Sequence, residues 1–154
     1  MNPTQLLNKF YTAFQQKDYA TMQSCYHSEA QFSDPVFQNL NALEVKAMWH
    51  MLCEQGKDLK IEFTTLDENT VIWKASYSFS KTERKVNNEI TATFEFKEGL
   101  IYRHTDKFDL WKWSGMALGI TGTLLGWTPF LKSKIRKMGM SGLRHFIKNN
   151  SEYH

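Results

Sequence analysis

Three side chains are placed where they could do acid–base chemistry: Asp34, His104 and Asp106. Asp34 follows residues 30–33, in which apolar and polar side chains alternate as in a half-buried strand. Asp34 continues the apolar face, and Pro35 ends the strand because it has no N–H to donate. We therefore expect a carboxylate aimed at the apolar interior, with a raised pKa that makes it a stronger base. The alternative is an Asp that only opens an Asp-Pro turn.

His104 and Asp106 are two positions apart in a later predicted strand, so both point to one face. A carboxylate so placed can orient the imidazole and raise its pKa. We expect a three-residue hairpin loop at residues 97–99, which puts Ala92 opposite His104 and Ile90 opposite Asp106. The alternative is that His104 and Asp106 only hydrogen-bond to each other near the end of the sheet and have no catalytic role. We expect no metal site, because two or three O/N ligands without a further His make a poor set.

Length and composition indicate one globular domain. The chain has 154 residues, and its 14% aromatic content fits a domain that also lines a pocket. The first residues lack a basic segment followed by an apolar run, so we expect no signal peptide and a cytoplasmic protein with Cys25 and Cys53 reduced. The net charge of +3 divides into +6 over residues 112–154 and −3 elsewhere. No basic stripe alternates with aromatics, so nucleic acid is not an expected partner.

Periodicity predicts helices first and a sheet afterwards. Asn2 begins a helix with one apolar face, Asp18 a short second helix that includes Tyr26, and Asn41 a third helix to about residue 55. Residues 27–29 are expected to form an exposed turn, and His50 is interpreted as solvated. Four alternating segments then predict an antiparallel sheet; they cover residues 59–64, 71–79, 90–97 and 100–110.

These elements predict an α+β fold, a cone-shaped α+β barrel in which the N-terminal helices cover the concave face of a curled antiparallel sheet. We expect residues 1–112 to form this cone domain and residues 113–154 a helical C-terminal extension packed on it. The cone should hold a small apolar ligand or substrate. The predicted pocket residues are Phe10, Phe14, Tyr26, Trp49, Trp73, Tyr77, Ala92, Phe94 and Phe108.

The extension begins with a stretch, residues 113–131, that contains no charged residue. Four glycines, Pro129 and several hydroxyl side chains interrupt it, so we interpret it as a short helix and turn over the pocket mouth or a subunit interface, not as a membrane span. A last helix from Pro129 has a broken apolar stripe and a basic face. Peripheral attachment to an anionic membrane is one explanation. A solvated basic face is the more frequent one, so a membrane is not an expected partner.

The run from Leu6 to Pro35, which ends in Asp34-Pro35-Val36, resembles the nuclear-transport-factor-2-like superfamily, and within it the ketosteroid isomerases and SnoaL-like polyketide cyclases. The resemblance spans roughly residues 3–111. It implies that Asp34 is a general base that moves a proton next to a carbonyl; in ketosteroid isomerase such an Asp works with a Tyr and a protonated Asp. It also implies that Tyr26 supports the pocket network and that two copies pair through the outer sheet face as a homodimer.

Two departures limit this resemblance. The oxyanion Tyr of the isomerases aligns with Phe10, and their second acid aligns with Ala92, so steroid isomerisation by that mechanism is not expected. We expect an isomerase, cyclase or dehydratase acting on an apolar carbonyl compound without a cofactor. Asp34 would be the base, His104 the acid or oxyanion partner, and Asp106 the group that orients His104. The alternative is a non-catalytic ligand-binding or assembly module, and a further variant is water activation as in an epoxide hydrolase.

Overall fold

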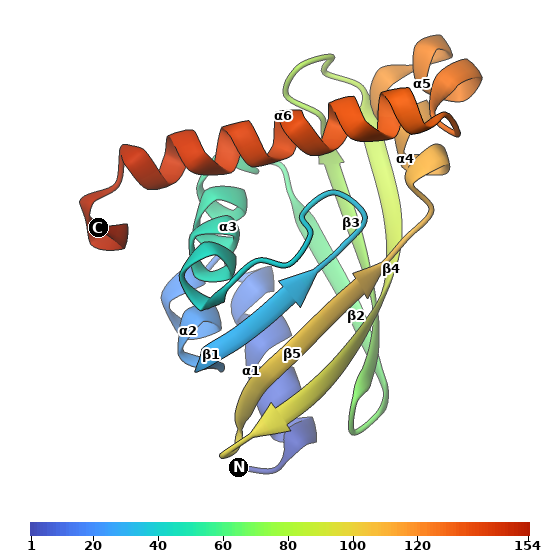
Figure 1. Cartoon of the computed structure of the whole chain (residues 1–154). Coiled ribbons are helices and arrows are strands. Elements are labelled where there is room, and N and C mark those ends of the chain that lie inside the picture. Colours follow the sequence, from blue (N-terminus) through green and yellow to red (C-terminus); the bar gives the residue numbers. More distant parts are fainter.

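The computed structural model describes residues 1–154 and shows a curled, unclosed five-stranded sheet with helices against its concave face (Figure 1). The strand order is β1-β5-β4-β3-β2. The predicted α+β architecture is confirmed. In chain order the elements are α1 (Pro3–Gln15), α2 (Tyr19–Ser24), β1 (Tyr26–Ser33), α3 (Ala42–Gln55), β2 (Lys60–Asp67), β3 (Thr70–Ser78), β4 (Lys85–Lys97), β5 (Leu100–Lys107), α4 (Leu110–Leu118), α5 (Ile120–Leu125), α6 (Pro129–Lys148) and the 3₁₀ turn η1 (Ser151–Tyr153).

The helices begin where capping residues occur in the sequence. Asn2 and Asn41 each form a capping box, with Gln5 and Glu44 at the third helical position. These reciprocal bonds satisfy N–H groups that a helix end otherwise leaves unpaired. The buried face of α1 then packs on the sheet, and α3 packs beside it over β1.

Strand β1 is longer than predicted and joins the sheet as its fifth strand, parallel to β5, with Phe32 paired to His104. It begins at Tyr26, so the helical assignment of Tyr26 and the exposed turn at residues 27–29 are wrong. The cause is long-range pairing: Ile101 N–H donates to the Cys25 carbonyl at 2.8 Å and holds this segment on the sheet edge.

The β4–β5 register also differs from the prediction. The hairpin turn has two residues, Glu98 and Gly99, both with positive φ. This is the backbone of a type I′ turn, which matches the twist of the strands. Together with a bulge near Glu95, the shorter turn moves the register by two residues, so Ala92 lies opposite Asp106 instead of His104. Asp106 thus occupies the place beside the position where the isomerases have their second acid.

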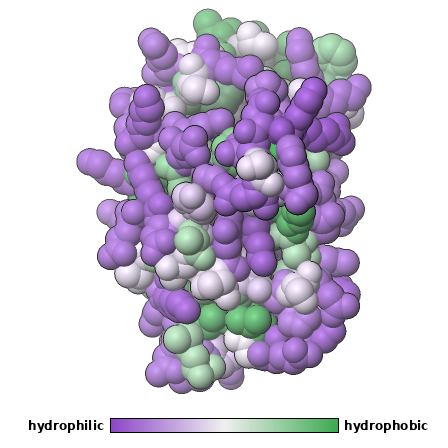
Figure 2. All heavy atoms as spheres, turned by 90° about the vertical axis from the view of Figure 1, so that its left-hand side faces the viewer, coloured by the Kyte–Doolittle hydropathy of each residue, from purple (hydrophilic) through white to green (hydrophobic).

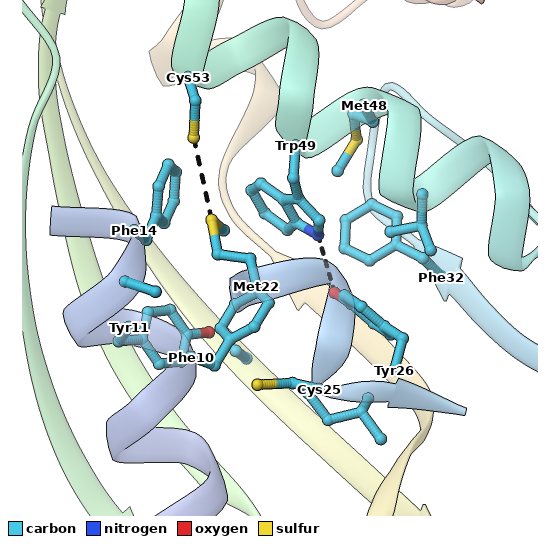
Figure 3. Packing of buried hydrophobic residues seen from close by; sticks show 14 of the residues in the cluster. Phe10, Tyr11, Phe14, Met22, Cys25, Tyr26, Phe32, Met48, Trp49 and Cys53 are labelled. Carbon is cyan, nitrogen blue, oxygen red and sulfur yellow. Dashed lines mark hydrogen bonds between the residues drawn. The ribbon is translucent and has the colours of Figure 1, made fainter. Parts of the chain in front are cut away.

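The main core is a cluster of 28 buried residues between α1, α2, α3 and the sheet. Figure 3 shows Phe10 and Phe14 of α1 facing Trp49 of α3, with Phe32 of β1 on the far side of the indole. Cys25 and Cys53 are free and buried, and Cys53 Sγ lies 3.9 Å from Met22 Sδ. Aromatic side chains therefore make up much of the cone interior.

The extension begins earlier than predicted. Asp109 caps α4 by accepting a hydrogen bond from Lys112 N–H, so β5 ends at Lys107 and the expected boundary at 112/113 falls inside a helix. Helices α4 and α6 build a second cluster over the end of β4. Its buried residues are Val86, Leu110, Trp113, Ala117, Leu131 and Ile135.

Helix α6 runs across the top of the molecule from α5 to α3 (Figure 1). Its residues Leu143 and Phe146 belong to the main core. His50 is buried beneath this end of the chain and not solvated as predicted: its Nδ1 lies 2.7 Å from the Tyr153 hydroxyl. The pattern of apolar residues within α3 could not show that His50 is buried by residues about a hundred positions later in the chain.

Candidate functional site

A buried chain of hydrogen bonds crosses the core from α3 to β5. Trp49 Nε1 donates to the Tyr26 hydroxyl at 2.8 Å (Figure 3), and that hydroxyl lies 2.7 Å from His104 Nδ1. His104 Nε2 lies 2.8 Å from Asp106 Oδ1. Because Tyr26 already accepts from Trp49, its own proton is free to donate to Nδ1, which leaves the Nε2 proton for Asp106. With the proton on Nε2, every polar side chain in this hydrogen-bond chain has a partner.

The surroundings of His104 are aromatic. Its ring packs against Phe10, Phe32, Phe94 and Trp49, with centroid separations between 4.3 and 6.0 Å. Both ring nitrogens have protein partners, so neither faces a ligand. The geometry makes His104 the group that fixes Asp106, whereas the spacing alone indicated the reverse arrangement.

Asp34 stands at the end of β1, as predicted, and it also opens a turn. Its Oδ1 accepts from Val36 N–H at 2.7 Å and Phe37 N–H at 2.6 Å. Oδ2 accepts no hydrogen bond from the protein. Burial raises the pKa of Asp34 to about 7, although the two turn amides act in the opposite direction. The two interpretations of Asp-Pro thus coexist: one oxygen holds the turn and the other is free.

Asp34 and Asp106 lie on neighbouring parallel strands. Phe32 pairs with His104, so two residues further along each strand Asp34 comes level with Asp106. The negative charge of Asp106 contributes to the raised pKa of Asp34. A nearby negative charge disfavours ionisation of the Asp34 carboxyl and so adds to the effect of its burial. The structure brings together two carboxyls with different partners.

Two buried hydrogen-bond donors in the core have no partner: the Tyr11 hydroxyl and Trp73 Nε1. Their rings are 6.2 Å apart. Burial raises the pKa of Tyr11 well above its usual value, and the charge of Asp106 adds to this. Buried donors are nearly always satisfied in folded proteins, so such a pair calls for an acceptor that the chain does not supply. Sequence reasoning missed Tyr11, although it is four residues after Leu7 on the buried face of α1.

All nine predicted pocket residues belong to the main core or pack against it. Phe10, Phe14, Tyr26, Trp49, Trp73, Ala92 and Phe94 are buried, and Tyr77 and Phe108 are partly buried. Tyr77 lies at the site's rim, where its hydroxyl accepts from Trp113 Nε1 at 2.7 Å. The charge of Asp34 and burial raise the Tyr77 pKa. No group of three His, Cys, Asp or Glu side chains is arranged to hold a metal ion.

Helix α6 covers the Asp34 turn from outside. Arg136 Nε donates to the Pro35 carbonyl at 2.9 Å, and a Cβ on Gly139 would come within 2.7 Å of Val36 Cγ1. Beside this contact is a groove of about 400 Å³. Its lining residues are Pro35, Phe108, Asp109, Leu110, Trp111, Trp127, Lys132 and Arg136. Pro35 is the neighbour of Asp34 in the chain, and Phe108 follows two residues after Asp106, just beyond the end of β5, so the groove lies close in sequence to both carboxyl residues. A larger hollow of about 690 Å³ lies on the polar outer face of the sheet.

The sequence profile of the SnoaL-like domain matches residues 7–104. The chain belongs to the SnoaL-like domain family. No curated protein matches it in sequence. The matched segment contains α1 to most of β5, including Asp34 and His104, whereas the α4–α6 extension lies outside it.

Solved structures share the fold of this SnoaL-like domain at low identity. An NTF2-like protein from Burkholderia thailandensis superposes with a TM-score of 0.61 and 18% identity, covering 71% of this chain and 92% of that one. An LEH-like epoxide hydrolase from M. tuberculosis gives 0.55 and 16%, covering 80% and 96%. TerC, co-crystallised with polyporic acid, gives 0.57 and 13%, covering 70% and 91%. At these identities the likeness establishes the fold and confirms the predicted architecture. The profile match over residues 7–104 confirms the predicted family.

Proposed function

We propose that this protein binds a small, largely apolar carbonyl compound inside the cone and moves a proton from one carbon of that compound to another. One observation carries the proposal: the Tyr11 hydroxyl and Trp73 N–H are buried without a partner, and Tyr11 lies within the electrostatic influence of Asp106. An oxygen-bearing ligand would supply the acceptor that these donors lack. The aromatic walls would bury the rest of the ligand, and the groove beside Pro35 and Phe108 would be its entrance.

In this proposal Asp34 is the general base. A pKa of about 7 leaves a substantial fraction ionised at neutral pH and gives the carboxylate strong proton affinity. The free Oδ2 takes a proton from the carbon next to the carbonyl, and the C–H electron pair moves into an enolate. Tyr11 donates its hydrogen bond to the enolate oxygen. Return of the proton to a different carbon completes an isomerisation. If the compound carries a β-hydroxyl group, that group can instead take the proton held by Asp34 and leave as water, which completes a dehydration.

Asp106 and His104 have supporting roles here. His104 is a positioning residue that acts through Asp106, because both of its nitrogens are engaged within the core. Burial is the main cause of the raised pKa that Asp34 needs as a base at neutral pH, and the charge of Asp106 adds to it. The same pair could instead activate a water molecule against an epoxide, as the fold neighbour's name suggests for that protein.

The competing function is ligand binding without catalysis. It is favoured by the turn hydrogen bonds that hold Asp34 Oδ1 and by the extensive packing of the core. The two functions differ in one respect: a binder needs Tyr11 and Trp73 but does not need Asp34 to be ionised.

The test is hydrogen–deuterium exchange at the α-carbon of enolisable ketones and lactones, followed by NMR, with thermal-shift binding measured in parallel. The wild type should accelerate exchange of a bound compound, and Asp34→Asn should lose about 100- to 10,000-fold of this. Tyr11→Phe should lose about 100-fold. Tyr102→Phe, on the outer side of β5, is the control and should change neither.

Equal exchange by wild type and Asp34→Asn would end the role of Asp34 as base. If ligand binding is lost in Tyr11→Phe but no bound compound shows accelerated hydrogen–deuterium exchange, the result would favour ligand binding without catalysis.

A further inference from the structure

The corner formed by α5 and the start of α6 exposes large apolar side chains. Ile120 is 78% exposed, Leu124 64% and Phe130 75%, with Leu125 and Trp127 also exposed between them. We call these five residues the apolar tip. Ile120 and Leu124 are four residues apart in α5 and so share one helix face. Solvated apolar side chains in such a group are unusual for a monomeric surface and indicate an interaction site.

A basic stripe continues from the apolar tip along α6. The stripe starts after Phe130 and consists of Lys134, Lys137, Arg144 and Lys148. All five residues are exposed, and their spacings of three, four or seven residues place them along one face of the helix. The opposite face of α6 is buried through Leu131, Ile135, Leu143 and Phe146. The stripe is therefore an outward surface that the fold itself does not use.

The charge of this region has a single sign. Residues 110–151 contain seven Lys and Arg side chains and no Asp or Glu. Figure 2 shows hydrophobic atoms at the top of the molecule, the level at which α5 lies in Figure 1, above a face that is mostly hydrophilic. Apolar tip and basic stripe thus join at Phe130 as one continuous outer surface.

We propose that the apolar tip and the basic stripe dock on an anionic lipid bilayer. Exposed Trp, Ile, Leu and Phe side chains suit the boundary between headgroups and acyl chains, and lysines beside them are attracted by anionic lipids. A second copy of the chain fits less well, because tip-to-tip pairing would bring two stripes of equal charge together. The attachment is peripheral, since none of the helices has the length and hydrophobicity of a membrane span.

The expected size of the effect follows from the charge of single lysines. Each Lys near an anionic membrane surface contributes about 1 kcal/mol, a factor of about five in partitioning. Replacing Lys134 and Lys137 by Gln should therefore weaken binding by about 25-fold. Replacing Ile120 and Leu124 by Ser removes two side chains from the apolar boundary and should weaken binding at least about tenfold.

The test is co-sedimentation of the full chain with vesicles of phosphatidylcholine alone and of phosphatidylcholine mixed with phosphatidylglycerol. We expect the wild type to pellet with the mixed vesicles only, and less as salt concentration rises. Leu66→Ser is the matched apolar control, because Leu66 is 57% exposed on β2 away from the tip. Lys60→Gln with Lys74→Gln, on the outer sheet face, is the charge control.

Specific loss in the tip and stripe variants, with both control variants unchanged, would support docking. Equal pelleting with the two vesicle types, or equal losses in the controls, would overturn it. Sedimentation velocity without vesicles tests whether the tip instead binds a second copy of the chain. A tip variant that changes the oligomeric state but not vesicle binding would assign the tip to a second copy and overturn the proposal.

Discussion

Replacing Asp34 by Asn should stabilise the protein at high pH and much less at low pH. Asn keeps an oxygen to accept from the Val36 and Phe37 amides but cannot ionise. In the wild type the pKa of Asp34 is raised from 3.8 to about 7 in the folded state. Between these values the native state holds a proton that the unfolded state releases, so the free energy of unfolding falls as pH rises.

The magnitude follows from the size of the pKa shift. Each unit corresponds to about 1.36 kcal/mol, so the interval between pH 5 and the folded pKa accounts for about 3 kcal/mol. Urea denaturation of wild type and Asp34→Asn at pH 5 and pH 8 should show the variant gaining this amount relative to wild type at the higher pH. The double difference cancels the contributions of titrating groups that do not interact with Asp34.

Asp18→Asn is the control for this experiment. Asp18 caps α2, and its hydrogen bonds to Thr21 lower its pKa, so it is ionised at both pH values and its difference from wild type should not change between them. A pH-independent difference for Asp34→Asn, or a variant less stable than wild type at pH 8, would refute the buried, high-pKa description of Asp34.

Three other expectations follow from single contacts. His104→Phe removes the partner of Asp106 Oδ1 and the group to which the Tyr26 hydroxyl donates, and should lower the free energy of unfolding by about 3–5 kcal/mol; a loss below about 1 kcal/mol in urea denaturation would contradict the hydrogen-bond chain. Gly139→Ala forces a methyl group against Val36 and should cost about 1–3 kcal/mol, whereas Gly142→Ala in the same helix meets open space and should stabilise by about 1 kcal/mol; thermal melts that rank them the other way would exclude close packing of α6 on the Asp34 turn. We expect a homodimer through the polar outer sheet face, and sedimentation equilibrium should show its mass at moderate salt; a monomer at all concentrations tested would exclude it.

Much of the fold could be predicted because its signals are local. Asn2 and Asn41 have capping partners three residues on, and the strands alternate with a period of two. The end of β1 at Ser33, directly before Asp34, follows from Pro35 alone.

The remaining features depend on interactions that are distant in sequence or atypical of their residue type. Glu98 adopts a positive φ, which is uncommon for a residue with a side chain, so the two-residue turn could not be recognised from Gly99 alone. The resulting register decides that Asp106, not His104, lies opposite Ala92. Tyr11 could have been predicted as a buried residue, because its spacing of four from Leu7 already places it on the buried face of α1.

The parallel pairing of β1 with β5 has a consequence for how the chain assembles during synthesis. Phe32 and His104 are paired although 72 positions separate them, so β1 has no neighbouring strand until nearly the whole segment matched by the SnoaL-like profile, residues 7–104, has left the ribosome. Long-range strand pairs close slowly because the entropy of the intervening loop must be lost first. Helix α6, which covers the Asp34 turn, emerges later still. The nascent domain therefore passes through a stage in which the aromatic interior is assembled but uncovered, and this is the stage at which a chaperone would find the most apolar surface.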